Sequence, residues 1–285
     1  MIEMTSNRYG KSRVRLVKVT RQDGLHELYE WMVEILLEGD FETAHTLGDN
    51  SKILPTDTMK NTVYSLARDS SATSIEVFAQ ELATFLMGRN PQVSVAHVTV
   101  ESTIWKRLTI EGRLHPDSFM RGSNERAVTK LRQDRKGSTL ASGLVDLVIM
   151  KTAKSGFENY IVDSLTTLKP AADRLFCTAL TADWTYSEAI AEGGSVDFNA
   201  LREEIRETML ESFAGHDSLS VQHTLYAMGE TALNKVKAIT EVHLLMPNKH
   251  CIPVDLSRFG QDNPNEIFVP TDEPHGTIEA TLRRG

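Results

Sequence analysis

Hydrophobic residues along the first half of the chain follow two periods, one typical of strands and the other of helices. Residues 13–21 (RVRLVKVTR) alternate and are rich in β-branched side chains, which predicts a strand. Met59, Val63 and Leu66 recur at i, i+4 and i+7 and predict a short amphipathic helix. The other predictions in this half are a helix over 74–88, strands over 93–105 and 125–133, a loop over 39–55 and a polar turn at 122–124.

Residues 26–38 fit both periods. Glutamates at 27, 30, 34 and 38 have near-helical spacing, whereas five apolar residues alternate without a break. The alternating set is Tyr29, Trp31, Val33, Ile35 and Leu37. We favour a strand, because unbroken alternation matches one face of a sheet.

The second half repeats this order of elements. Its predicted strands cover 144–151, 175–190, 239–245 and 251–256, and its helices cover 198–213 and 221–236. Gly193-Gly194 interrupts the regular pattern before the first helix, and Ser218 or Ser220 can cap the second helix. Pro247-Asn248-Lys249 is predicted to form a turn between the last two strands. The order ββααββ, twice, predicts an α+β protein of two antiparallel sheets with helices on one face of each. We place the boundary in the polar stretch 134–138, so the two repeats cover 1–138 and 139–285.

Composition narrows the class of protein. The 285 residues fit about two domains. Lys and Arg number 31 against 39 Asp and Glu, and the net charge of −8 argues against nucleic acid as a main partner. Cys177 and Cys251 form no CxxC pair and fit thiols in a reducing cytosol. Residues 1–8 lack an apolar signal segment, and no apolar run approaches the ~18 residues of a membrane span. We therefore expect a soluble cytoplasmic protein with no membrane partner.

Common catalytic motifs are absent from the sequence. It has no P-loop, dinucleotide fingerprint, GxSxG or HExxH motif, and its nine histidines are scattered. The hydrophobic pattern alone therefore predicts only a soluble α+β protein of two similar halves.

Short motifs along nearly the whole chain resemble those of the urate oxidase (uricase) family, which has the tunnelling fold. They are YGK at 9–11, TD at 56–57 with KNTVY at 60–64, Phe157, TTL at 166–168, DR at 173–174, SVQ at 220–222, LMPNKH at 245–250 and FGQDNPNE at 259–266. Each motif is short, and their shared order and spacing make the resemblance specific.

The resemblance implies oxidation of urate by O₂ and water to 5-hydroxyisourate and hydrogen peroxide, in purine degradation. It implies no metal or other cofactor, because the deprotonated purine is itself electron-rich. It also implies a homotetramer whose sheets form a barrel, which closes exposed strand edges. Active sites would lie between subunits, where Lys11 and Thr56 meet Phe157, Arg174 and Gln222 of a neighbour.

The resemblance assigns the substrate-binding residues by position. They are Asp57, Phe157, Arg174, Val221, Gln222 and Asn248. A guanidinium fork such as that of Arg174 matches paired acceptors on the purine edge, and the Gln222 amide complements ring amides. Phe157 would stack on the ring, and Asn248, aimed outward by its turn, would face the dioxygen or water site. Asp57 and Val221 would act through main-chain amides.

The resemblance assigns proton transfer to Lys11, Thr56 and His250. A lysine beside a threonine hydroxyl can accept its proton or stabilise developing negative charge. A histidine exchanges protons near neutral pH.

Each of these residues also has a structural interpretation. Arg174 beside Asp173 fits a solvated surface residue, Phe157 a core position, and Thr56 or Asp57 a helix cap. Lys11 and Gln222 fit solvated positions, and His250 fits a structural histidine.

The chain departs from the family at 158–160 (ENY), where relatives are less acidic and carry glycine and aromatic residues, and in a shorter tail after Arg284. Two other functions remain open. One is another purine or pterin enzyme of the tunnelling fold, and the other is a catalytically silent purine-binding assembly.

Overall fold

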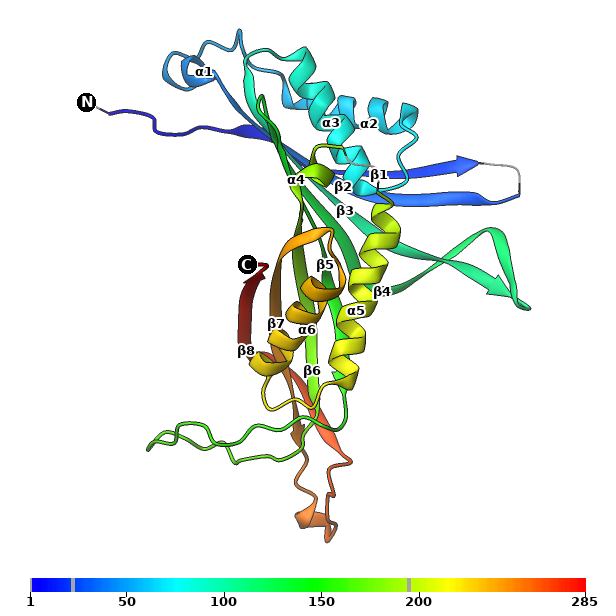
Figure 1. Cartoon of the computed structure of the whole chain (residues 1–285), viewed down its shortest axis with the longest axis vertical. Coiled ribbons are helices and arrows are strands. Elements are labelled where there is room, and N and C mark those ends of the chain that lie inside the picture. The colour runs from blue at the N-terminus through cyan, green and yellow to red at the C-terminus, as the bar shows by residue number, and fades with distance from the viewer. Residues whose placement is uncertain (1, 22–23, 194–195) are drawn as a thin grey trace. The chain divides into compact units, whose positions relative to one another are not determined.

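The computed structural model describes residues 2–21, 24–193 and 196–285 (Figure 1). The chain divides into two compact units. The first comprises residues 1–143 and 185–199, and the second comprises residues 144–184 and 200–285. Of the predicted Gly193-Gly194 break, Gly193 has a positive φ of 101° and Gly194 lies outside the described residues.

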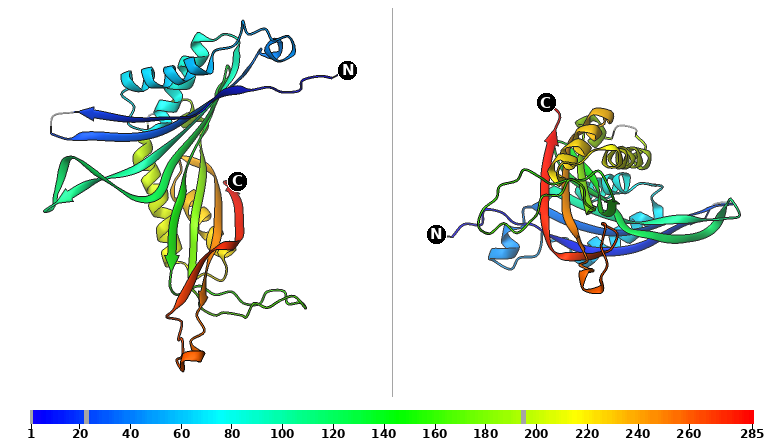
Figure 2. Two further views of the ribbon diagram at one scale, coloured as in Figure 1. Left: turned by 180° about the vertical axis from the view of Figure 1, so that it is seen from behind. Right: turned by 90° about the horizontal axis from the view of Figure 1, so that it is seen from below.

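In the first unit, helices cover one face of a set of long strands (Figures 1 and 2). Helix α2 packs on β1, and α3 packs on β3 and β4. The elements are β1 (Tyr9–Arg21), β2 (His26–Gly39), α1 (Glu42–Thr46), α2 (Thr56–Asp69), α3 (Ile75–Arg89), β3 (Val93–Ile110), β4 (Arg113–Asp134), the start of β5 (Ser138–Lys151) and α4 (Glu188–Ala191).

The second unit has the same arrangement, with α6 packed on β7 and β8. Its elements are the rest of β5, β6 (Phe176–Tyr186), α5 (Phe198–Gly215), α6 (Val221–Lys235), β7 (Ile239–Pro253), the 3₁₀ helix η1 (Ser257–Phe259) and β8 (Phe268–Arg283). A long segment, residues 152–175, connects β5 to β6.

The strands are hydrogen-bonded in the order β1-β2-β3-β4-β5-β6-β7-β8, so one sheet contains both sets of four. The pairs β1–β2, β2–β3, β3–β4 and β7–β8 are antiparallel. The predicted α+β class with two ββααββ repeats is confirmed, but the two sheets that we expected are one sheet of eight strands. The division into compact units does not test where one repeat ends, so the boundary at residue 138 stays a prediction.

The ambiguous segment 26–38 forms strand β2, as favoured. Trp31, Val33, Ile35 and Leu37 are at most 1% exposed, and the Trp31 ring centroid lies 4.8 Å from that of Phe78 in α3. Burying each such side chain contributes roughly 1.5–3 kcal/mol. The alternating apolar residues decide the structure of this segment, and the helical spacing of the glutamates does not. Only the alternating residues form an apolar face that the helices can cover.

Several local predictions were wrong. The loop predicted over 39–55 contains the short helix α1. The turn predicted at 122–124 lies inside β4, and the chain reverses at Glu111 and Gly112, where φ is 51° and 76°. Two consecutive positive φ values are typical of a tight hairpin turn. The strand predicted over 251–256 is the end of β7, and the last strand, β8, was missed.

Candidate active site

Helix α2 begins at Thr56, the first residue of the predicted Thr56-Asp57 pair. Pro55 is the N-cap residue, and no side chain in the described part of the chain caps the helix. The interpretation of Thr56 or Asp57 as the cap is therefore wrong, because both lie within the first turn. The first four N–H groups of a helix lack partners within it, so the main chain presents hydrogen-bond donors here.

Tyr9 fixes the chain just before this turn. Its hydroxyl donates to the Leu54 carbonyl oxygen at 3.2 Å and accepts from the Leu54 N–H at 2.8 Å. A Cβ at Gly10 would lie 1.7 Å from the Ile35 carbonyl oxygen, so only glycine permits this approach of β1 to β2. Lys11 follows directly, where the pairing of β1 with β2 becomes irregular. The contacts of Tyr9 and Gly10 thus place the YGK motif, which includes Lys11, in the same region of the first unit as the start of α2.

The carboxylate of Asp57 is engaged within α2. Lys60 forms an ion pair with it, and Asn61 Nδ2 donates to Oδ2 at 3.0 Å. The hydrogen bond from Lys60 is the largest cause of the lowered pKa of Asp57, and the charge of Lys11 lowers it further. Lys11 therefore lies close to the first turn of α2. The engaged carboxylate leaves the main-chain N–H of Asp57 as the group that could meet a ligand, in keeping with its predicted role.

Phe157 and Arg174 come together at opposite ends of the segment that links β5 to β6. The main chain of Phe157 exchanges two hydrogen bonds with Ala171, of 2.7 and 3.1 Å. The Arg174 guanidinium carbon lies 5.2 Å from the Phe157 ring centroid, within cation–π range. Among the described residues, the buried Nε of Arg174 has no hydrogen-bond partner, and burial lowers the pKa of the guanidinium. This half-buried cation has an unused donor.

Asp173 uses its carboxylate for main-chain groups. Its Oδ1 accepts from the N–H of Ser155 at 3.0 Å and from the N–H of Arg174 at 3.1 Å. The alternative interpretation, in which Arg174 is a solvated surface residue, does not fit its half-buried side chain and buried Nε. Asp173 therefore fixes the local fold, and the Arg174 guanidinium lies against an aromatic ring instead.

Tyr160, one of the residues that depart from the family pattern, stacks on Phe157. Their ring centroids are 5.0 Å apart and their planes differ by 13°. The Tyr160 hydroxyl donates to the Leu168 carbonyl oxygen at 2.7 Å. The departure thus lies in direct contact with a predicted substrate-binding side chain.

Helix α6 begins with Val221, which is buried, and Gln222, which is exposed. Ser220 is the N-cap, and its Oγ accepts from the His223 N–H at 3.0 Å, as one of the two predicted caps. The first turn contains no acidic residue, so the helix itself does not offset the partial positive charge at its N-terminus. The start of α6 could therefore bind an anion, provided that other groups orient it.

Asn248 and His250 both lie in β7, where Asn248 pairs with Gly276 and His250 with Thr271. The predicted turn at 247–249 is wrong, because β7 continues through it. Pairing with β8 overrides the local turn preference of Pro-Asn, and the register shifts between Asn248 and His250. The segment 152–175, the start of α6 and the end of β7 lie at the same end of the second unit (Figures 1 and 2).

The structure thus brings the predicted site residues together in two groups, one in each unit. Lys11, Thr56 and Asp57 form the first group, which we call the α2 group. Phe157, Arg174, Val221 and Gln222 form the second, the α6 group, with Asn248 and His250 at the same end of that unit.

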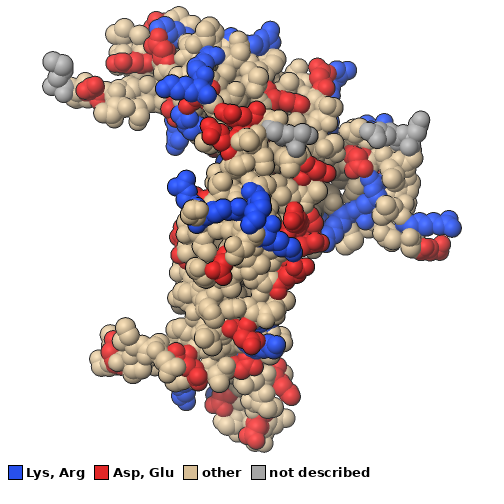
Figure 3. Space-filling model, in the orientation of Figure 1, with Lys and Arg blue, Asp and Glu red and all other residues tan. Residues whose placement is uncertain are grey.

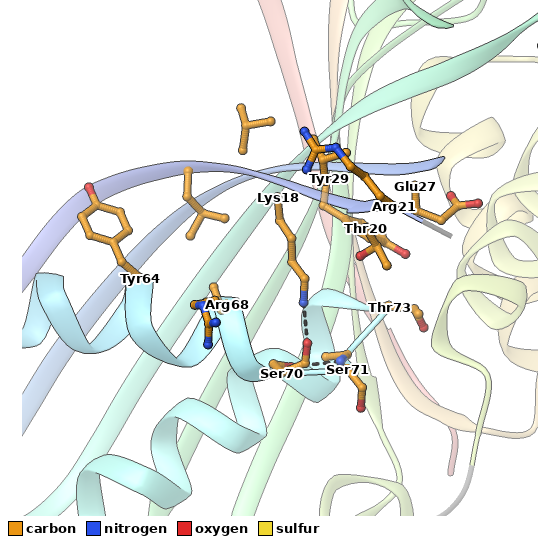
Figure 4. Close-up of a pocket in the computed structure, with 15 residues that line it drawn as sticks. Lys18, Thr20, Arg21, Glu27, Tyr29, Tyr64, Arg68, Ser70, Ser71 and Thr73 are labelled. Carbon is orange, nitrogen blue, oxygen red and sulfur yellow. Dashed lines mark hydrogen bonds between the residues drawn. The ribbon is translucent and has the colours of Figure 1, made fainter. Parts of the chain in front are cut away.

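A cavity of about 760 Å³ lies between β1 and the end of α2, and it contains none of the predicted site residues (Figure 4). Consecutive residues 16–21 of β1 line it, as do Tyr64, Arg68 and residues 70–73. Lys18 Nζ donates across it to the Ser70 carbonyl oxygen. Because β1 is the first strand of the sheet, this cavity exposes a strand edge.

Charges of both signs are interspersed on the face seen in Figure 3. Within residues 2–21, 24–193 and 196–285, no three His, Cys, Asp or Glu side chains are grouped to hold a metal ion. None of the helices in these ranges is both long and apolar enough to cross a membrane.

Comparison with known proteins decides the family. A family model described as "Uricase" matches residues 7–132 and 140–279. The chain belongs to the uricase family. It is 38% identical to a uricase from Arthrobacter globiformis over 283 residues, which cover 99% of this chain and 90% of that protein. It is 36% identical to a uricase from Dictyostelium discoideum over 287 residues, covering 100% of this chain and 98% of the relative.

Solved structures of uricases share the fold. The crystal structure of the Arthrobacter globiformis uricase matches with a TM-score of 0.93 at 37% identity, covering 100% of this chain and 96% of that one. A urate oxidase from Bacillus sp. TB-90 matches with a TM-score of 0.85 at 22% identity, covering 98% and 100%, and supports the fold alone. The predicted family membership is confirmed.

Several residues that shape the two groups were missed or left without a role. Tyr9, Gly10 and Lys60 belong to motifs of the family. Only the tertiary contacts show the roles of Tyr9 and Gly10, whereas Lys60 contacts Asp57 within one turn of α2. His216 and His223 lie beside the start of α6 and were not noted. The sequence signal for His223 was its position three residues after the possible capping residue Ser220, because that position lies in the first turn of a helix.

Proposed function

We propose that this chain oxidises urate with O₂ and water to 5-hydroxyisourate and hydrogen peroxide, without a bound cofactor. Urate transfers two electrons to O₂, and a C5 hydroperoxide forms. Loss of hydrogen peroxide and addition of water at C5 then give the product. Membership of the uricase family supports urate as the substrate.

The observation that carries this proposal is the contact between Arg174 and Phe157. A flat anion requires a cation in the plane of its polar edge and an apolar surface against its face. The guanidinium lies 5.2 Å from the centroid of the aromatic ring, and its buried Nε lacks a partner among the described residues. A bidentate acceptor on urate would satisfy that donor, which the protein alone leaves unsatisfied.

The start of α6 supplies a second set of donors. Ser220 accepts from the third amide of the helix, so the amides of Val221 and Gln222 precede the capped position and lack partners within the helix. The Gln222 side chain is exposed and offers both an acceptor and donors. Together these groups complement the alternating carbonyl and N–H edges of a purine.

The α2 group supplies proton transfer in this proposal. The Thr56 hydroxyl, at the start of α2, takes or gives a proton at the bound purine, and Lys11 accepts that proton or stabilises the charge that develops. Lys60 and Asn61 occupy the Asp57 carboxylate, which keeps a competing anion away from the substrate. His250 exchanges the proton with solvent, and Asn248 orients O₂ or water.

We also propose a homotetramer in which the α2 group of one protomer faces the α6 group of another. The two outer strands of the sheet differ in charge. Strand β1 carries only cations, Lys11, Arg13, Arg15, Lys18 and Arg21, whereas β8 carries Asp272, Glu273 and Glu279 with the single cation Arg283. The cavity beside residues 16–21 leaves room at the β1 edge (Figure 4). Pairing β1 of one protomer with β8 of another would join opposite charges and cover both edges.

The free thiols of Cys177 and Cys251 fit purine degradation in the reducing cytoplasm.

The decisive test is aerobic incubation of the pure protein with urate. We expect urate absorbance to be lost and hydrogen peroxide to be released in a 1:1 ratio. Removal of O₂ is expected to stop the reaction, and a chelator is expected to leave it unchanged. A folded tetramer that binds 8-azaxanthine without turning over urate would instead be the silent purine-binding assembly.

A further inference from the structure

The linker between α5 and α6, residues 216–220, touches both parts of the α6 group. The Ser218 N–H donates to the Lys154 carbonyl oxygen at 2.9 Å, and the Gly156 N–H donates to the Ser218 carbonyl oxygen at 2.8 Å. These bonds hold the chain next to Phe157. Two residues later, Ser220 caps α6. A shift of this linker would therefore move the Phe157 segment and the α6 amides relative to each other.

Two histidines lie against each other at this linker. The ring centroids of His216 and His223 are 4.2 Å apart, with planes at 69°. His223 Nδ1 accepts from the Leu219 N–H at 3.4 Å, which requires an unprotonated Nδ1. His216 Nε2 is buried and, within the described residues, has no hydrogen-bond partner. This arrangement fits two neutral rings and leaves no acceptor for an added proton.

The charged groups around the histidine pair are two lysines and two aspartates. Lys151 of β5 donates from Nζ to the carbonyl oxygens of Phe213, at 3.2 Å, and His216. Lys154 lies on the segment after β5 and faces Asp217 of the linker at 3.7 Å. Asp173 also acts on Lys151, but its carboxylate is engaged by main-chain amides.

Burial, followed by the charges of His223 and Lys151, lowers the pKa of His216, and Asp217 opposes them. The folded state thus takes up this proton at a lower pH than the unfolded state does. The stability that depends on the neutral ring is present above the unfolded pKa of about 6.5 and is lost as the pH falls below it.

We propose that His216 and His223 are positioning residues that hold the linker while His216 is neutral, and that urate binding weakens when His216 takes up a proton. A proton on His216 adds a cation against the His223 ring, in the first turn of α6, near the positive N-terminus of that helix. The inference rests on the proposed function, because it assigns urate to the α6 group. Beyond the proposed function, the inference predicts that the affinity for urate depends on pH through residues that do not themselves contact urate.

The first test compares KM for urate at about pH 8 and about pH 6 in the full-length protein and two variants, His223→Gln and His216→Asn. Glutamine keeps an acceptor for Leu219 but does not titrate. We expect the wild-type KM to rise about tenfold on acidification, and the rise in each variant to be smaller by at least about threefold. The dependence of kcat on pH should be the same in all three proteins. His45→Gln, at an exposed position of α1, is the matched control and should keep the wild-type rise in KM.

A second measurement requires no substitution at the pair. Histidine ring-proton NMR should show that 8-azaxanthine shifts the titration of His216 to lower pH, because coupling between ligand and proton is reciprocal. Variants with the wild-type rise in KM, or a titration that the ligand leaves unchanged, would overturn the role of the histidine pair while urate turnover stands. A protein that neither oxidises urate nor binds 8-azaxanthine would overturn the proposed function and this inference together.

Discussion

The starts of α2 and α6 carry motifs of similar kind, Thr56-Asp57 and Val221-Gln222, but their electrostatics are opposite. Helix α2 has an acidic residue in its first turn and follows a proline without a side-chain cap, whereas α6 has a capping serine and no acid in its first turn. Aspartate offsets the helix dipole in α2, and nothing within the first turn offsets it in α6. The second helix start is therefore better suited to bind an anion.

This difference divides the work of the proposed reaction. In this proposal, the α6 group, with the half-buried cation Arg174, would provide affinity for urate. The α2 group, where the charge of Lys11 acts on Asp57, would provide proton transfer. Substitutions in the first group should therefore raise KM, and substitutions in the second should lower kcat.

The strongest test of this division is in the α2 group. We expect Thr56→Ala and Lys11→Ala each to lower kcat about 10²–10⁴-fold, the usual effect of losing a positioned acid or base, with KM nearly unchanged. Steady-state kinetics with urate measure both constants. Thr58→Ala, which removes an exposed hydroxyl one position after Asp57, is the control and should keep wild-type kcat. If Thr56→Ala retained full kcat, the proton-transfer assignment would be wrong.

The corresponding substitution in the α6 group is Arg174→Ala. Loss of hydrogen bonds to a charged partner costs about 1.5–3 kcal/mol, so kcat/KM should fall about 10–150-fold. Most of the loss should appear in KM and in the dissociation constant of 8-azaxanthine. Arg89→Ala removes an exposed arginine that also lies over an aromatic ring, Phe85, and should leave both constants unchanged. A loss confined to kcat would contradict the assignment of affinity to this group.

The cap of α6 allows a smaller and more selective test. Ser220→Ala should cost about 1 kcal/mol of stability, as loss of an N-cap usually does, and should also raise KM several-fold because the amides of Val221 and Gln222 lose their fixed direction. Ser74 caps α3 in the same way, accepting from the Val77 N–H at 3.3 Å. Ser74→Ala should lower the unfolding temperature similarly without changing KM. Equal KM in the two variants would show that the α6 start does not position substrate.

Periodicity predicted the fold well wherever one face of an element is buried. Strand β2 is the clearest case, since its apolar alternation outweighed four glutamates at helical spacing. Errors occurred where pairing overrides local preference. Gly122 and Pro247 read as turn residues, yet both lie inside strands. Pro247 pairs with Thr277, and Gly122 lies in an irregular stretch of β4 between the paired residues Arg121 and Arg126. Strand β8 was missed because most of its residues are exposed, so it shows no apolar period.

Site residues were predicted by resemblance alone, not by pattern. No periodicity joins Phe157 to Arg174, because a segment that returns through Ala171 brings them together. Similarly, no spacing rule connects Tyr9 to Leu54, 45 residues later. Contacts of this kind depend on tertiary structure, and a single sequence carries them only through a family motif. Where the chain departs from the family, at 158–160, the sequence made no prediction.

That departure gives the smallest predicted effect, through Tyr160. Its ring stacks on Phe157, and its hydroxyl is held by Leu168, so we interpret it as a support that fixes the Phe157 ring for stacking on urate. Tyr160→Ala should then weaken urate binding by about 0.5–1.5 kcal/mol, the usual contribution of an aromatic pair. Tyr160→Phe should keep wild-type affinity if stacking matters more than the hydroxyl. A KM that falls in Tyr160→Ala would mean the opposite, that Tyr160 occupies the position of urate on the Phe157 ring and must leave before substrate binds.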